Sequence, residues 1–412
     1  MRIVVRYLAF AGLLLCMLNS YAGTSEQFLV VPRCLLSGNS FRYEELASLK
    51  WLRLIKITDL HPLQAAVVKK EARCRGFINV TRAWRDYSKR KQLDAAAFLS
   101  HYAPASRRGD LTRHYKIQYQ NEVNSLVREI DTAQIRRELS KLTHFPDRHL
   151  HSEDGARAAQ WIRQQAKTLI ASSERKDTEL LLIPTEGHSK QPSVMMKIGK
   201  ALSEPGIVIG AHLDTIDSVD ESQPGADDGA SGVATVLETA RLLLNSHLQF
   251  NKPIYLVWYA GSEAGKLGSQ SVVQYFKRHH LPVDSVLQLD MTGYVGADGE
   301  PQIGLADDST DAGLTTFVAD LVTAYVKLPV GVRRCGYACS DHVIWYQNGN
   351  RVAYPLETMD ETSNPYVHKR RDTMDKLSLT HVRDFVKLST AFAVELAEPI
   401  ITPLLSTSSL KR

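Results

Sequence analysis

"GIVIGAH", residues 206–212, is a short and almost wholly apolar run that ends in a histidine. Two runs of the same kind follow it along the chain, "PIYLVWYA" at 253–260 and "SVLQLDM" at 285–291. Dense apolar runs of this length are typical of strands that are buried in a parallel sheet. The three runs therefore predict neighbouring buried strands.

Helical patterns lie between and after these runs. Apolar residues recur at helical spacing in 233–244, in 314–325 and in 382–393. Strands that alternate with helices predict a layered α/β domain. A different composition precedes it, because residues 23–120 combine strand-like stretches at 28–32 and 51–58 with a basic, helix-like segment around 84–102. This region predicts a small α+β unit that ends near 104–113.

Residues 1–22 have the features of an export signal. Arg2 and Arg6 precede an apolar stretch at 7–18, and small residues that suit cleavage end at Ala22. A lipoprotein signal at Cys16 is a weaker alternative, because a small residue is expected where Leu15 stands. No later segment is long and apolar enough to span a bilayer. The sequence thus predicts a secreted or periplasmic protein without stable membrane association.

The net charge and the cysteines bear on possible partners and on disulfides. A net charge of +5 is small for 412 residues, and with no long basic block nucleic-acid binding is not predicted. Export leaves four cysteines in an oxidising compartment. The short spacing of Cys335 and Cys339 favours a local disulfide, with two reduced thiols as the alternative. A Cys34–Cys74 disulfide is possible, but the spacing does not support it.

Potential metal ligands follow the predicted strands. His212 ends the first strand, Glu263 and Asp290 lie at or just past the ends of the next two, and Asp227 begins a helix. Open α/β sheets bind ligands at the carboxyl ends of their strands. Asp214 is placed to receive the second N–H of the His212 imidazole and fix its tautomer. Taken singly, each residue has a structural alternative: a lone histidine after a strand is usually structural, and "GADDGASG" (225–232) also fits an ordinary Asp-Gly turn with a helix cap.

Six motifs together resemble the zinc aminopeptidases of the M28 type, including the secreted bacterial leucyl aminopeptidases. They appear in the family's order over roughly residues 120–385: "GAHLDT", "PGADDGASG", "AGSEAGKLGS", "LDMTGY", "CGYACSDH" and "NPYVHKRRDTMDKL". The resemblance implies a zinc-exopeptidase fold, with a mixed, mostly parallel sheet flanked by helices, over about 121–400. The region 23–120 would then be a pro-region that assists folding or blocks the site, or a permanent accessory domain.

The resemblance also implies two zinc ions and a peptide N-terminus as substrate. His212 and Asp290 would bind one zinc, Glu263 and His368 the other, and Asp227 would bridge them. Imidazole and carboxylate are suitable zinc ligands, and paired metals can polarise a carbonyl and activate a water. Tyr337, inside the implied Cys335–Cys339 loop, would help to stabilise the tetrahedral intermediate; a packed surface tyrosine is the alternative.

The motif "AGSEAGKLGS" departs from the family pattern twice. Ser262 stands where the first of two adjacent glutamates, the general base, is expected, and Lys266 replaces a leucine. A serine hydroxyl neither accepts nor donates protons readily near pH 7, and a positioned base is typically worth about 10²–10⁴ in rate. The leading hypothesis is a zinc aminopeptidase with a weakened proton shuttle. A non-catalytic zinc- or peptide-binding relative is the second, and glutaminyl cyclisation, which also needs an acidic base, the third.

Overall fold

A computed structural model describes most of the chain. It covers residues 26–70, 74–89, 93–103, 115–187, 189–200, 204–217, 222–359 and 364–401. The predicted export signal, with Cys16, lies outside these described residues.

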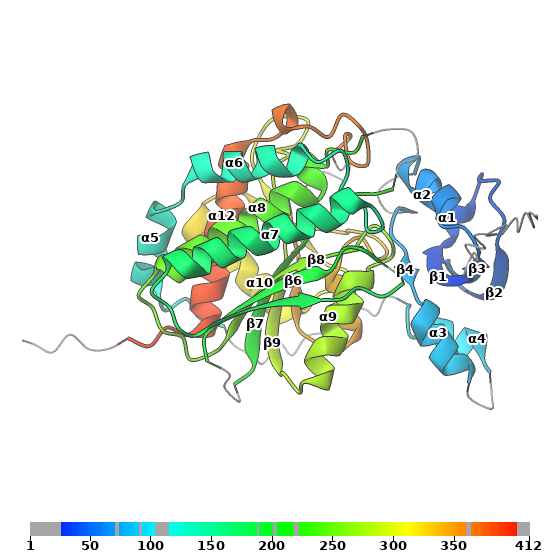
Figure 1. Cartoon of the computed structure of the whole chain (residues 1–412), viewed down its shortest axis with the longest axis horizontal. Coiled ribbons are helices and arrows are strands. Elements are labelled where there is room, and N and C mark those ends of the chain that lie inside the picture. Colours follow the sequence, from blue (N-terminus) through cyan, green and yellow to red (C-terminus); the bar gives the residue numbers. More distant parts are fainter. Residues whose placement is uncertain are drawn as a thin grey trace, which may run out of the picture.

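The N-terminal region forms a small α+β unit, as predicted, at the blue and cyan end of Figure 1. Its antiparallel sheet has the order β2-β3-β1-β4, and the Cys34–Cys74 disulfide joins α1 to the segment after α2. The apolar side chains of β1 and β3 alternate between the two faces of the sheet. One set packs into a small core built mostly from the N-terminal region, and the other joins a core that is shared with the larger region. The elements are β1 (Gln27–Pro32), α1 (Arg33–Leu36), β2 (Glu44–Leu49), β3 (Leu52–Ile57), α2 (His61–Val68), β4 (Ile78–Asn79), α3 (Thr81–Ser88) and α4 (Ala95–Ser100).

A six-stranded mixed sheet forms the centre of the larger region. Its order is β12-β9-β7-β8-β6-β5; the pairs from β12 to β8 are parallel, and those to β6 and β5 are antiparallel. The three quoted apolar runs form the adjacent strands β9, β7 and β8, which confirms the predicted mixed, mostly parallel sheet. The strands are β5 (Thr178–Ile183), β6 (Ser193–Ile198), β7 (Gly206–His212), β8 (Ile254–Tyr259), β9 (Val283–Gln288) and β12 (Val352–Ala353).

Helices cover both faces of this sheet (Figure 1). Buried apolar residues of α8 and α12 make most of the core on one face, where α5, α6 and α7 also pack. On the other face, α9 and α11 contact the strands. These helices are α5 (Gln120–Arg128), α6 (Thr132–Thr143), α7 (Glu153–Ser172), α8 (Gly232–Asn245), α9 (Leu267–Arg278), α11 (His342–Gln347) and α12 (Leu379–Ala397).

A second, three-stranded sheet adjoins the strand ends. Its order is β11-β10-β13, and helix α10 packs beside it. The helix predicted over 314–325 is only partly regular, because α10 gives way to the π-helical turn η3, in which the hydrogen bonds run over one residue more. The elements are β10 (Ile303–Ala306), α10 (Ala312–Leu321), η3 (Val322–Val326), β11 (Val330–Arg333), β13 (Pro355–Leu356) and η4 (Met374–Lys376).

The boundary between the two regions falls earlier than residue 120. Tyr115 stacks on Phe317 of α10 with ring centroids 5.0 Å apart. The backbone N–H groups of Gln118 and Tyr119 donate to the Glu395 carboxylate of α12. Residues 115–119 therefore already pack on the larger region.

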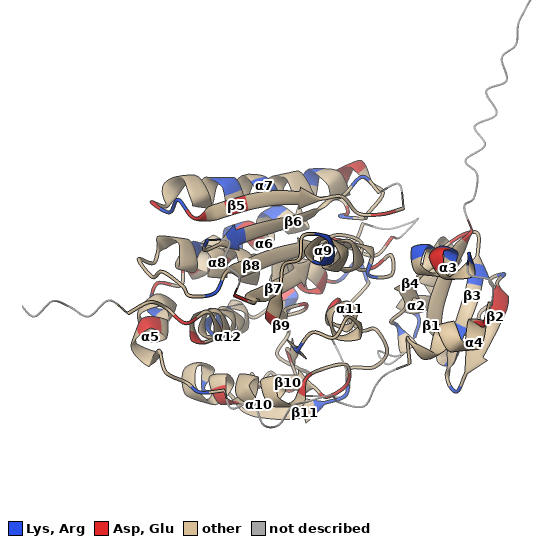
Figure 2. Ribbon diagram, turned by 90° about the horizontal axis from the view of Figure 1, so that it is seen from below, with Lys and Arg blue, Asp and Glu red and all other residues tan. Residues whose placement is uncertain are grey.

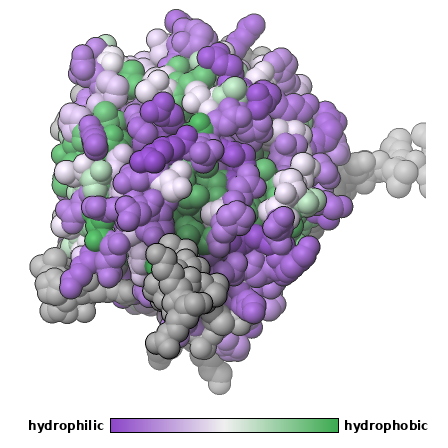
Figure 3. Space-filling view, turned by 90° about the vertical axis from the view of Figure 1, so that its left-hand side faces the viewer, coloured by the Kyte–Doolittle hydropathy of each residue, from purple (hydrophilic) through white to green (hydrophobic). Residues whose placement is uncertain are grey.

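The surface carries charges of both signs, dispersed over helices and loops of both regions (Figure 2). The face farthest from the N-terminal region is largely hydrophilic and is interrupted by small hydrophobic areas (Figure 3). Among the described residues, no helix is both long enough and apolar enough to span a bilayer.

Candidate metal centre

The parallel strands bring three of the predicted ligands to one edge of the sheet. His212 is the last residue of β7, Asp290 follows β9, and Glu263 follows β8. Neighbouring parallel strands end at the same edge, so their trailing side chains converge. The turn η2 (Ala226–Ser231) supplies Asp228, and His368 comes from the loop before η4.

Two clusters of ligand atoms meet at Asp228. His212 Nε2 lies 2.9 Å from Asp290 Oδ1 and 3.2 Å from Asp228 Oδ1. The other Asp228 oxygen, Oδ2, lies 3.0 Å from His368 Nε2, which is 3.1 Å from Glu263 Oε2. In each cluster the ligand atoms all lie within 4.8 Å of one another. Nitrogen and oxygen donors in two compact, buried sets that share one carboxylate fit a pair of zinc ions.

The bridging position therefore belongs to Asp228, and the assignment of Asp227 is corrected. Asp227 turns away: its Oδ1 accepts from Gly293 N at 2.9 Å and its Oδ2 from Asn364 Nδ2 at 2.7 Å. The backbone causes the exchange, because Asp228 has non-helical angles (φ −76, ψ 90) and Gly229 has a φ of +99. This reversal directs the second aspartate rather than the first toward His212 and His368.

Buried hydrogen bonds hold the turn that carries Asp228. Asp372 accepts from the backbone N–H groups of Asp227 and Asp228 at 2.9 and 3.0 Å. The fully buried guanidinium of Arg148 donates to the carbonyls of Pro224 and Gly225. A Cβ at Gly229 would come within 3.2 Å of the His212 ring, so a side chain there would crowd a ligand.

The electrostatics of the two histidines fit a site for cations. Burial alone would lower the pKa of His368, but Glu263 and Asp228 outweigh it and raise the pKa to about 10. Burial would also lower the pKa of His212. Asp290 and the neighbouring carboxylates outweigh it and raise this pKa well above its ordinary value. Burial would raise the pKa of Asp228, yet His368 and His212 lower it well below the usual range. The carboxylates thus concentrate negative charge where positive charge is needed.

Asp214 holds two parts of the site together. Its backbone carbonyl, rather than its carboxylate, is the nearer partner of His212 Nδ1, at 3.0 Å against 3.6 Å for Oδ1. The carboxylate accepts from the backbone N–H groups of Ser262 and Glu263, each at 2.9 Å. Asp214 therefore fixes the His212 tautomer through its main chain and the position of the Glu263 turn through its side chain.

Ser262 is buried and gives no replacement for a base. Its side chain is only 1% exposed, and its Oγ makes no hydrogen bond among the described residues. Its backbone carbonyl accepts from Lys266 Nζ at 3.1 Å. Lys266, 5% exposed, lines the same cavity as the metal ligands, so both departures from the family pattern lie beside the centre.

Tyr337 packs against the N-terminal region and does not line the space over the two clusters. Its ring packs edge-on against Trp51 of the N-terminal region, with centroids 5.4 Å apart. The residue is 5% exposed, and its hydroxyl makes no hydrogen bond within the described part of the chain. Burial, with a further contribution from Tyr102, raises the pKa of Tyr337 well above its ordinary value. The tyrosine is thus held in an apolar setting formed largely by the N-terminal region.

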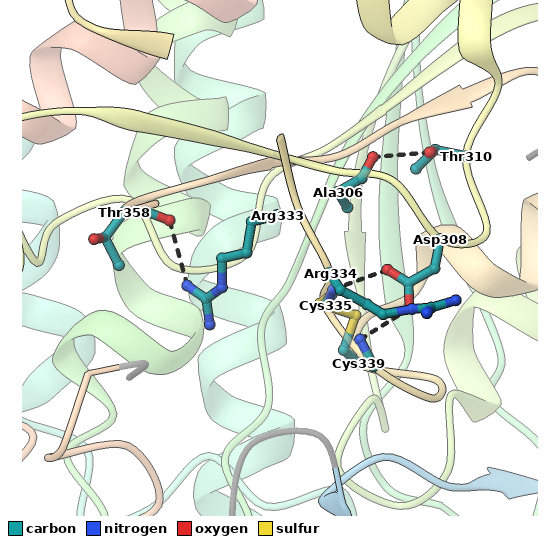
Figure 4. Close-up of a disulfide and its surroundings, with 9 residues drawn as sticks. Ala306, Asp308, Thr310, Arg333, Arg334, Cys335, Cys339 and Thr358 are labelled. Atoms are coloured by element: carbon teal, nitrogen blue, oxygen red, sulfur yellow. Dashed lines mark hydrogen bonds and ion pairs between the residues drawn. A yellow bond between two sulfur atoms is a disulfide. The ribbon is translucent and has the colours of Figure 1, made fainter. Parts of the chain in front are cut away.

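The disulfide Cys335–Cys339 forms beside the cavity (Figure 4). Asp308 accepts from the backbone N–H groups of Cys335 and Gly336 at 2.8 and 2.9 Å, which anchors the start of the loop. The predicted local disulfide is therefore present. The pairing of Cys34 with Cys74, which spacing left open, is present as well.

A small cavity of about 90 Å³ lies over the two clusters. Its walls include Met291, Tyr354, Leu356 and Val367, which are apolar or aromatic, and the carboxyl of Glu357. Burial and the nearby Asp227 raise the pKa of Glu357 well above its usual range. The cavity is thus an apolar recess with the candidate metal centre on one wall.

The N-terminal region closes part of this cavity. Arg75 and Gly76 line it together with Asp228 and Glu263. Burial lowers the pKa of Arg75, and the charges of Asp228 and Glu263 oppose this shift, so the guanidinium faces the ligand carboxylates.

The same region also holds the turn after β8. Asn79 N donates to Gly265 O at 3.0 Å, and Gln64 Nε2 donates to Glu263 O at 3.3 Å. The motif that carries Glu263 is therefore bound from outside by the N-terminal region.

Sequence reasoning missed Arg148, Asp372 and Glu357 as well as the correct aspartate. The only sequence signal for Asp228 was its place beside Asp227, which does not separate the two. Arg148 precedes the predicted motifs, and nothing in its sequence context marks it.

Comparisons with known proteins agree with this geometry. The family description "Peptidase family M28" matches residues 193–393. Leucine aminopeptidase 1 of Emericella nidulans is 31% identical over 358 residues, which is 83% of this chain and 88% of that protein. LapB from Legionella pneumophila is 38% identical with a TM-score of 0.84, over 91% of this chain and 100% of the other. The LapA aminopeptidase of Legionella pneumophila is 35% identical with a TM-score of 0.81, over 90% and 98%.

Proposed function

This chain belongs to peptidase family M28 and is a metallo-aminopeptidase by its relatives; we propose that it is exported and removes N-terminal residues from peptides at a two-zinc centre. The observation that carries the proposal is the pair of ligand clusters that share Asp228. His212 and Asp290 would hold one zinc, Glu263 and His368 the other. Two zinc ions so placed would polarise the scissile carbonyl and activate a water.

The chain's own residues would orient the ligands and hold the substrate, but they would not supply an efficient proton transfer. Asp214 orients His212 and the Glu263 turn. The apolar walls of the cavity would hold the side chain of the N-terminal residue and exclude water. Ser262 cannot carry a proton from the attacking water to the leaving amine, so we expect slow turnover.

The assay uses full-length protein, zinc-saturated or stripped with a chelator, and a fluorogenic leucyl amide. We expect zinc-dependent release of the fluorophore, at a rate that falls when His368 is changed to Ala. Zinc-independent hydrolysis would contradict a metal mechanism.

Ser262 favours one other function, a zinc- and peptide-binding protein that does not cleave. It keeps every metal ligand but lacks the base. If the zinc-saturated chain binds a leucyl amide and hydrolyses nothing, this second function replaces the first.

We further propose that the N-terminal region, from residue 23 to the stretch 104–114, is a pro-region that holds the enzyme in a blocked state. Arg75 and Gly76 occupy the cavity wall, and a Cβ at Gly76 would come within 1.7 Å of the Tyr337 carbonyl oxygen, so the contact is close. Trp51 packs on Tyr337, the residue expected to stabilise the tetrahedral intermediate, and Tyr337 does not line the cavity. Removal of the region would open the cavity and free Tyr337 at once.

The test is a specific protease site placed within 104–114, between the two regions. Cleavage and removal of the N-terminal part should raise the hydrolysis rate. In the uncut chain, Arg75→Ala combined with Trp51→Ala should give part of the same rise, and Arg42→Ala, an exposed arginine of the same region, should give none. Equal rates before and after removal would indicate a permanent accessory domain.

A further inference from the structure

Lys266 is a buried cation in the substrate cavity, at a position that the family pattern fills with leucine. It has a left-handed backbone, with a φ of +65, at the tight turn before α9. Backbone hydrogen bonds fix this turn, because the N–H groups of Gly265 and Lys266 both donate to Ser262 O, at 3.1 and 3.0 Å. The side chain therefore leaves a rigid turn and enters the cavity.

The ammonium of Lys266 has unused hydrogen-bonding capacity. It carries three N–H groups, of which one donates to the Ser262 carbonyl at 3.1 Å. Among the described residues, no carboxylate comes within ion-pairing distance of it. A buried ammonium without a counter-ion is costly, because desolvation removes the water that would otherwise compensate the charge.

Neither Glu263 nor Asp341 forms an ion pair with Lys266. Glu263 faces His368 in the metal centre, and Asp341 accepts from the Ser269 hydroxyl. Burial raises the pKa of Asp341, and Lys266 opposes that shift, so the two groups sense each other without forming an ion pair. With zinc bound, the charge of Glu263 would be engaged by the metal, and Lys266 would face the cavity.

With zinc bound, the cavity would carry surplus positive charge. Two zinc ions bring four positive charges to the three carboxylates Asp228, Glu263 and Asp290, and Lys266 adds one more. A glutamate at 262 and a leucine at 266 would make the same site two charges more negative. Arg333, which donates to Thr358 O (Figure 4), also lines the cavity. The cavity thus combines apolar walls with surplus positive charge.

We propose that Lys266 is a specificity-determining residue that pairs with the side-chain carboxylate of a substrate whose N-terminal residue is Asp or Glu. This inference rests on the proposed function for the position of the substrate. The carboxylate would accept hydrogen bonds from the N–H groups of Lys266 that are not bonded to Ser262, and it would supply the missing counter-ion. A neutral leucyl side chain would leave the ammonium unpaired.

The test compares Lys266→Met with a matched control, Lys327→Met. Lys327 also has a φ of +65, but it is exposed at the end of η3. Both changes therefore replace a lysine with a left-handed backbone conformation, and only Lys266→Met alters the cavity. Calorimetric titration of the zinc-saturated full-length chain with L-aspartate and with L-leucine reads binding directly. Hydrolysis of aspartyl and leucyl anilides gives a ratio of kcat/KM in which partial blockage by the N-terminal region cancels.

We expect wild type to favour the aspartyl over the leucyl probe, and Lys266→Met to reduce this preference about tenfold or more, the scale of one charged hydrogen bond. Lys266→Arg should keep the preference, which separates charge from folding if the methionine variant is unstable. Lys327→Met should change neither readout.

Three results would overturn the inference: no preference for aspartate in wild type, an equal loss for both probes in Lys266→Met, or no loss at all. An equal loss would mean that Lys266 acts on the turn or the reacting carbonyl. Lys266-dependent aspartate binding without any hydrolysis would instead leave the inference standing and reject the aminopeptidase function. Hydrolysis of both probes without any preference for aspartate, unchanged in Lys266→Met, would do the reverse.

Discussion

The metal wall of the cavity and the turn at 261–266 differ in how many of the expected functional groups they carry. The metal wall presents His212, Asp228, Asp290, Glu263 and His368 in two compact clusters. The turn at 261–266, which also carries Glu263, keeps the backbone hydrogen bonds from Ser262 and Glu263 to Asp214, but it presents a serine where the family pattern has a carboxylate. The hydrogen bonds that would position a carboxylate at residue 262 are thus intact, although the carboxylate itself is absent. Metal binding and proton transfer are therefore separable properties of this site.

The largest expected effect is on the metal wall, at Asp228. Asp228→Asn removes the charge that both clusters share, and we expect zinc affinity to fall by roughly 100-fold or more, since even groups that only support ligands contribute about 10–100-fold. Zinc titration with a competing chelator measures it.

Asp227→Asn is the matched control. Because Asp227 accepts hydrogen bonds from Gly293 and Asn364 rather than facing the clusters, this variant should keep both metals. Loss of zinc from Asp227→Asn with retention in Asp228→Asn would restore the assignment made from the sequence.

The next effect is on proton transfer, at Ser262. Ser262→Glu places a carboxylate on a turn that Asp214 already holds, and we expect kcat to rise by an order of magnitude or more, since a positioned base is typically worth about 10²–10⁴. Zinc content should not change. The gain should be mainly in kcat, because the proton moves in the transition state.

Lys266 complicates this prediction in a testable way. Its ammonium, 3.1 Å from the Ser262 carbonyl, would attract a new carboxylate at 262 and make it a weaker base. Ser262→Glu combined with Lys266→Leu should then exceed the single variant. If wild type is already fast and Ser262→Glu is neutral, another acid carries the proton, and Glu357→Gln tests the remaining carboxyl of the cavity.

The last prediction concerns the stability of the protein rather than zinc binding or turnover, and its site is a buried acid outside the cavity. Burial raises the pKa of Glu138 on α6 to about 8. Between its ordinary value near 4.5 and about 8, the folded protein holds a proton that the unfolded chain has lost. The free energy of unfolding contributed by this group is therefore complete below that window and falls as pH rises, by up to about 1.4 kcal/mol per pH unit.

Glu138→Gln keeps an acceptor for Gln134 and removes the titration. Urea unfolding of metal-free protein between pH 5 and 8 should show the variant gaining on wild type as pH rises. Glu129→Gln, an exposed change at the C-terminal end of α5, is the control. Parallel curves for wild type and Glu138→Gln would contradict the shifted pKa.

Sequence predicted the sheet better than the loops. The run at 206–212 coincides with β7, because a strand buried on both faces must be apolar at every position. The helical spacing at 314–325 falls within α10 and the π turn η3 that continues it, but spacing alone does not distinguish the two kinds of helix.

Site residues were predictable where a strand end fixes them and not where a turn does. His212, Glu263 and Asp290 follow from strand order, whereas Asp227 and Asp228 are separated only by the backbone reversal at Gly229. Tyr337 depends on a distant contact, with Trp51 nearly 300 residues earlier in the chain, and no local pattern reveals it.

The most direct measurement is the zinc content of the purified full-length protein after saturation and removal of free metal, determined by elemental analysis. The two clusters joined by Asp228 predict close to two zinc ions per chain, falling below one in Asp228→Asn. Less than one zinc ion per wild-type chain would contradict the two-metal centre on which the proposed chemistry depends.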